Sequence, residues 1–126
     1  MKYLQINGVK KKFDCCHLAA AFLKGELGIN TSDWNSVSRE YDLRKEAEYI
    51  HNEMLKVDMV DVDDSYQKGD IIIYKSGKYR AAVATCVDDK VALVLRKLSA
   101  ETHIERIDNK LFHMRHASKV AQEETL

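Results

Sequence analysis

The hydrophobic pattern changes from helical to strand spacing near Gly69, and this change sets the fold class. Before it, apolar residues recur at helical spacing over residues 15–27 and from about 37 to 55. After it, short apolar runs alternate with turn residues and predict strands at 71–74, 81–87, 91–95 and 103–107, with 111–117 as a last strand or short helix. Helices followed by an antiparallel meander predict an α+β fold.

The remaining segments fit a single domain spanning residues 1–126. Residues 3–13 predict a hairpin around an Asn-Gly turn, since both turn residues tolerate positive φ. We expect a helical part over 14–56 and a β-meander over 69–117. Residues 56–68 are acidic and favour no regular element. The last residues, 122–126, are expected to fray.

The charge balance excludes some classes of partner. Twenty basic and twenty acidic residues cancel, so the chain has no general attraction to nucleic acids or anionic membranes. No apolar run is long enough to cross a bilayer, and the first residues lack the apolar core of a signal peptide. We therefore expect a cytoplasmic protein that binds neither nucleic acid nor membrane.

The cysteines carry the clearest chemical signal. Two of the three are adjacent, which argues against a disulfide framework. Asp14 is a predicted helix N-cap, so Cys15 falls in the first helical turn, where unpaired N–H groups and the macrodipole favour a thiolate. Cysteine hydrolases activate their nucleophile in this way. On these residues alone, a buried structural cysteine is an equal alternative. Cys16 and Cys86 are expected to point into the core.

Two segments resemble the NlpC family of papain-like cysteine hydrolases. Residues 13–29, FDCCHLAAAFLKGELGI, are similar to the nucleophile helix in its phage-tail form, which often ends in Glu-Leu-Gly-Ile. Residues 69–74, GDIIIY, resemble the family's Gly-Asp motif before an apolar strand. The resemblance implies a compact papain-like domain with N-terminal helices packed on an antiparallel sheet. It matches Cys15 to the nucleophile, Asp14 to the preceding residue and Asp70 to the aspartate that starts the sheet.

The same resemblance indicates that the catalytic machinery is incomplete. Family enzymes carry a histidine base at the head of the next strand and a second histidine about a dozen residues later. Aligning the turn at 88–91 puts Ala81 and Leu93 at these two positions, and neither can accept a proton. A general base contributes ~10²–10⁴-fold, and triad members act as a unit. Residues 30–68 replace the family's usual connection, and a helix there that closed the groove would disfavour catalysis further.

Three functions follow as hypotheses. The first is a catalytically degenerate domain of phage or prophage origin, located in the host cytoplasm or the virion. It would bind a tail component, or a peptide in the former substrate groove. The second is an active peptidase or amidase that cleaves peptidoglycan stem peptides. There Cys15 attacks, His103 acts as base, and the backbone amides of Cys15 and Cys16 hold the oxyanion. The third is a small intracellular inhibitor of a host protein.

Several other side chains have weaker signals. Tyr79 and Arg80 adjoin the lost base position, where Arg80 would hold the Cys15 thiolate or a ligand carboxylate, or else serve as a surface residue. His113 and His116 would share a helix face but would point to opposite faces of a strand. The sequence contains no recognised metal-ligand spacing, so we expect neither metal nor cofactor.

Overall fold

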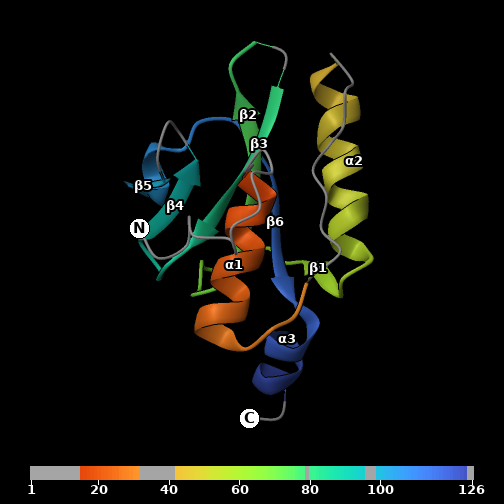
Figure 1. The fold of residues 1–126 in the computed structure, drawn as a ribbon, viewed down its shortest axis with the longest axis vertical. Coiled ribbons are helices and arrows are strands. Elements are labelled where there is room, and N and C mark those ends of the chain that lie inside the picture. The colour runs from red at the N-terminus through yellow and green to blue at the C-terminus, as the bar shows by residue number, and fades with distance from the viewer. Residues whose placement is uncertain (1–14, 32–41, 79, 96–98, 125–126) are drawn as a thin grey trace, which may run out of the picture.

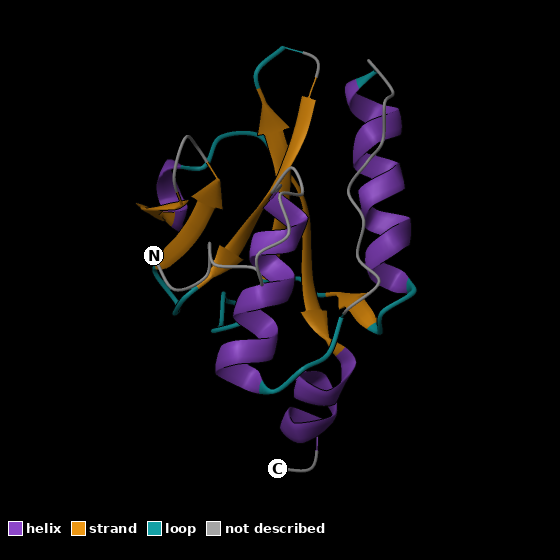
Figure 2. Cartoon of the chain, in the orientation of Figure 1, coloured by secondary structure: helices purple, strands orange, loops and turns teal. Residues whose placement is uncertain are grey.

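The computed structural model describes residues 15–31, 42–78, 80–95 and 99–124. Within them, helices and a six-stranded antiparallel sheet form an α+β domain, which confirms the predicted class (Figure 1; Figure 2). The expected hairpin at 3–13 lies outside the described residues. The helices are α1 (Cys15–Leu27), α2 (Leu43–Leu55) and α3 (Ala117–Glu124). The strands are β1 (Met59–Asp61), β2 (Ile71–Ser76), β3 (Arg80–Cys86), β4 (Val91–Leu95), β5 (Ser99–His103) and β6 (Lys110–His116), with a 3₁₀ turn, η2, at Ile104–Arg106.

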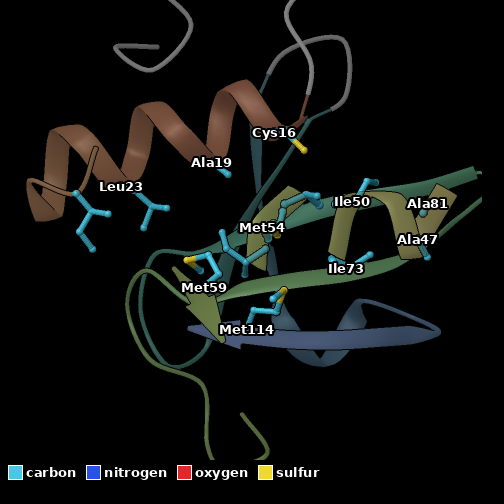
Figure 3. Packing of buried hydrophobic residues seen from close by; sticks show 13 residues of the cluster. Cys16, Ala19, Leu23, Ala47, Ile50, Met54, Met59, Ile73, Ala81 and Met114 are labelled. Atoms are coloured by element: carbon cyan, nitrogen blue, oxygen red, sulfur yellow. The ribbon is translucent and has the colours of Figure 1, made fainter. Parts of the chain in front are cut away.

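The sheet is ordered β1-β6-β2-β3-β4-β5, so the last strand lies between two earlier ones. Side chains alternate between its two faces. Ile71 and Ile73 point to the face that α1 and α2 cover, which we call the helix face. Ile72 points to the opposite face, which the segments 62–69 and 104–109 cross. Figure 3 shows the core on the helix face, including Cys16, Leu23, Ile50, Met54, Met59, Ile73 and Met114.

Local signals explain where the two long helices begin and end. α1 stops at Leu27 because Gly28 adopts φ +67°, and the N–H of Ile29 donates to the Leu23 carbonyl at 3.1 Å. α2 starts at Leu43, later than predicted, because Asp42 is extended and its carboxylate accepts the N–H groups of the first turn. The first residues of that predicted helix, up to 41, lie outside the described part of the chain.

Three segments depart from the sequence-based expectation. The strand predicted at 103–107 is wrong: β5 ends at His103, and η2 then turns Ile104 and Ile107 into the core of the opposite face. The irregular stretch at 56–68 contains β1, which forms because the end of β6 pairs with it. Helix α3 runs to Glu124, into the tail that was expected to fray. β1 and η2 depend on pairing or bonding with residues that are distant in sequence.

Candidate functional site

Cys15 lies at the first position of α1, as the sequence predicted. Its side chain is partly buried and packs against the core of the helix face. Cys16 is 4% exposed and belongs to that core, so it points inward as expected. Asp14, the predicted cap, lies outside the described residues. A hydrolase would need a proton acceptor within hydrogen-bond reach of the Cys15 thiol.

The position matched to the base is closed by α2. Ala81 is 8% exposed and lies against Ala47 of that helix in the core of the helix face (Figure 3). Glu46, also on α2, is 2% exposed, and its Oε1 accepts the Ala81 N–H at 2.8 Å and the Arg80 Nε at 2.9 Å. The carboxylate thus fastens α2 to β3. Arg80 is held by Glu46, and Tyr79 lies outside the described residues.

The position matched to the orienting histidine is equally apolar. Leu93 is 2% exposed and forms a small cluster with Leu18 and Phe22 of α1. Its side chain fixes α1 on β4 and offers no hydrogen-bonding atom. Neither matched position therefore supplies proton chemistry.

All five histidines of the chain fall within the described residues. His17 is two positions beyond Cys15 on α1 and points to a different side of the helix. His51 of α2 bonds both carboxylate oxygens of Asp61 at 2.9 Å and stacks on Phe112. His116 bonds the Ser118 hydroxyl at 2.7 Å, beyond the end of β6.

His103, the candidate base, is not brought to Cys15. It is exposed at the end of β5, on the edge of the sheet and level with the end of β3 at Cys86. At that end of the sheet Gly69 bonds the Cys86 carbonyl and lies against Leu27, the last residue of α1. Cys15 starts the same thirteen-residue helix, which is about 20 Å long. His103 therefore lies towards the C-terminal end of α1, whereas Cys15 lies at its N-terminal end.

The remaining histidine belongs to a buried network on the opposite face of the sheet. Asp70, just before β2, is fully buried, and its Oδ2 bonds His113 Nε2 at 2.6 Å. Its Oδ1 accepts Arg115 Nε at 2.8 Å, and its Oδ2 also accepts Arg115 Nη2 at 2.9 Å. The Gln67 N–H adds a further bond at 3.0 Å. The sheet itself separates His113 from Cys15.

Arg115 ties the segment before β2 to this network. It is 2% exposed, and its Nη1 and Nη2 groups donate to the two carboxylate oxygens of Asp64 at 2.9 and 2.8 Å. Its Nη2 also donates to the Ser65 carbonyl at 3.0 Å, and the Tyr66 ring lies 4.3 Å from that of His113. We call Asp64, Asp70, His113 and Arg115 the arginine network. Sequence reasoning identified Asp70, named His113 only as a weaker signal, and missed Asp64 and Arg115.

The electrostatics of this region follow from burial and charge pairing. Burial alone would raise the pKa of Asp70, but hydrogen bonds from His113 and Arg115 outweigh it and leave that pKa below its ordinary value of 3.8. Burial, reinforced by the Asp70 charge, raises the pKa of Cys86 to about 12. Cys86 is thus a neutral core thiol near pH 7 and cannot act as a nucleophile.

The arginine network makes stability dependent on acid pH. Because the folded-state pKa of Asp70 lies below its unfolded value of ~3.9, its contribution is complete above that value and is lost as pH falls through the lower folded pKa. We expect the urea midpoint to fall steeply below about pH 4. The variant Asp70→Asn should start from a lower midpoint and show a shallower acid dependence. A wild-type midpoint unchanged down to about pH 3 would contradict this prediction.

No protein-family model, curated protein or solved structure matches this chain. The described residues contain no cluster of three or more histidine, cysteine or acidic side chains placed to hold a metal. In the same part of the chain, no helix is long and apolar enough to cross a membrane.

Proposed function

We propose that the chain is a catalytically inactive relative of the NlpC-type cysteine hydrolases that acts as a protein-binding module, as in phage tail assembly. One observation carries the inactive part of this proposal. Ala81, at the position matched to the base, is buried beneath α2, and its N–H is bound by Glu46. The helix that crosses this position lies within residues 30–68, the segment for which the sequence left open whether it covers the groove.

Acyl transfer by a cysteine needs a thiolate, a base that accepts and returns the proton, and space for the substrate. A methyl group stands at position 81, and the nearby Glu46 carboxylate is held on β3 by two N–H groups that donate to its Oε1. The histidines that pair with carboxylates, His51 and His113, bind Asp61 and Asp70. Neither matched position and neither of these two histidines therefore supplies the base that the peptidase or amidase hypothesis needs.

The binding part of the proposal rests on the resemblance to phage-tail domains and on what α2 covers. Because α2 lies over Ala81, a partner is expected to bind a surface other than the former substrate groove. The scaffold is well suited to this role, since α1, α2 and the sheet share one apolar core and hold their exposed edges in fixed positions.

The reactivity of Cys15 tests the inactive part directly. We expect its alkylation by iodoacetamide to rise with pH as for an ordinary thiol, whose pKa is ~8.5. The measurement is the rate constant between about pH 5 and pH 10 in the variant Cys16→Ser. The buried Cys86 should stay unmodified in the folded protein, which peptide mapping verifies.

Histidine variants serve as controls. His103→Ala and His113→Ala should leave the alkylation profile unchanged, because neither ring lies near Cys15. A second rate step near neutral pH that disappears in either variant would show a thiolate–imidazolium pair and would overturn the inactive assignment. Cys15→Ala should not alter partner binding.

A further inference from the structure

Strand β5 forms one edge of the sheet, and within the residues described no strand pairs with its outer side. Such an edge presents a row of backbone N–H and C=O groups to which an extended segment can add. The register of β5 shows which of its residues carry these outward groups.

The direction of each backbone group in β5 follows from one hydrogen bond beside the start of β4. Ile104 donates to the Lys90 carbonyl at 2.8 Å, so this pair and those in phase with it, such as Thr102 with Ala92, bond β5 to β4. Since antiparallel strands alternate, Glu101 and His103 direct their N–H and C=O groups away from β4.

The side chains at this edge add a charge pattern. Glu101 and His103 are exposed and lie opposite Leu93 and Val91, so they emerge on the helix face beside α1. Ala100 and Thr102, which alternate with them, are partly buried on the opposite face. The outward backbone groups at the centre of β5 are thus flanked by one carboxylate.

We propose that β5 accepts an extended segment of a partner protein as an additional antiparallel strand, with a lysine or arginine opposite Glu101. This inference rests on the proposed binding function and names the surface and the chemistry of the partner. The outward N–H and C=O groups of Glu101 and His103 supply the backbone bonds. A cation opposite Glu101 supplies a favourable cross-strand pair.

A second copy of this chain is a poor occupant for the same reason. Two β5 strands paired over their whole length, antiparallel about a two-fold axis, would place Glu101 opposite Glu101. Like charges directly opposite destabilise a pair of strands. Glu101 thus selects a basic foreign strand and opposes self-pairing, so we expect Glu101→Thr to increase self-association.

The test uses two synthetic probes with ¹⁵N-labelled full-length protein. One is an acetylated, amidated seven-residue peptide of alternating threonine and lysine, and the other replaces lysine with glutamate. We expect the lysine peptide to cause saturable shifts in the amide signals of Glu101 and His103. Its affinity should exceed that of the glutamate peptide by about tenfold, because its lysine forms an attractive cross-strand pair with Glu101 whereas a glutamate there would be repelled.

The variant Glu101→Lys makes the test specific. Its side chain is exposed, so the fold should persist, and the preference between the two peptides should reverse. Equal binding of both peptides, shifts away from β5, or an unchanged preference in this variant would overturn the proposal. If neither peptide shifts the β5 amide signals and Cys15 alkylation follows the pH dependence of an ordinary thiol, only the β5 surface is rejected. If Cys15 alkylation depends on a histidine, the proposed function itself is rejected.

Discussion

Replacing Arg115 with methionine is expected to lower the free energy of unfolding by about 3–5 kcal/mol. Arg115 is 2% exposed and neutralises Asp70, which is fully buried. Methionine fills a similar volume but leaves the Asp70 charge with His113 as its remaining side-chain partner. Removing one member of a buried ion pair is far more damaging than removing both, because an uncompensated charge stays in the core. Urea unfolding followed by circular dichroism measures the loss.

Two variants separate this mechanism from a simple loss of packing. Arg44→Met removes an arginine whose side chain is 89% exposed, and should change stability by less than about 0.5 kcal/mol. The double variant Asp70→Asn/Arg115→Met removes the stranded charge and should be less destabilised than the sum of its single variants. A loss below about 1 kcal/mol in Arg115→Met, or strict additivity in the double variant, would contradict the assignment.

The variant Ala81→His is expected to lower stability by about 2–3 kcal/mol without creating a hydrolase. The substitution restores the residue type that the resemblance assigns to the base. However, Ala81 is 8% exposed beneath α2, so an imidazole there would push on Ala47 and disturb the Glu46 bond to the backbone. The loss is measured by urea unfolding, and activity by release of product from a peptidoglycan stem peptide.

A neighbouring position provides the matched control. Ala82→His places the same side chain one residue on, on the opposite face and at a partly buried site. It should cost less stability than Ala81→His and be equally inactive. Peptide cleavage by Ala81→His that also requires Cys15 would show that the scaffold lacks only its base, and would contradict the view that α2 closes the site.

The elements that the sequence predicted well are those fixed by neighbouring residues. The apolar spacing of α1 and the glycine at position 28 are local signals, and the helix ends where they place its end. β4 has the predicted bounds because a turn with a capping Asp88 carboxylate precedes it. The predicted start of α2 is too early because the apolar stripe begins on the N-terminal side of Asp42, the residue that caps the helix.

The candidate site was less predictable because its partners are distant in sequence. Asp70 was singled out by the Gly-Asp motif, but His113 and Arg115 bind it from 43 and 45 residues away. The sequence does contain one pattern that would have grouped these two residues: apolar and polar residues alternate from Phe112 to Arg115. On a strand, this alternation puts His113 and Arg115 on the same face. The role of Glu46 could not be predicted from the sequence, because a single charged residue in a helical segment is expected to lie on the exposed side of the helix.

The strand order has a consequence for how the molecule is made. β6 is the last strand in the chain, yet it is inserted between β1 and β2. A nascent chain that has reached only Asn109 contains Asp70 without Arg115 or His113, and β1 without its partner. Contacts between such distant segments form late and slow folding. The sheet is therefore completed only after synthesis has passed β6, and until then the chain exposes the edges of β1 and β2 that β6 will cover.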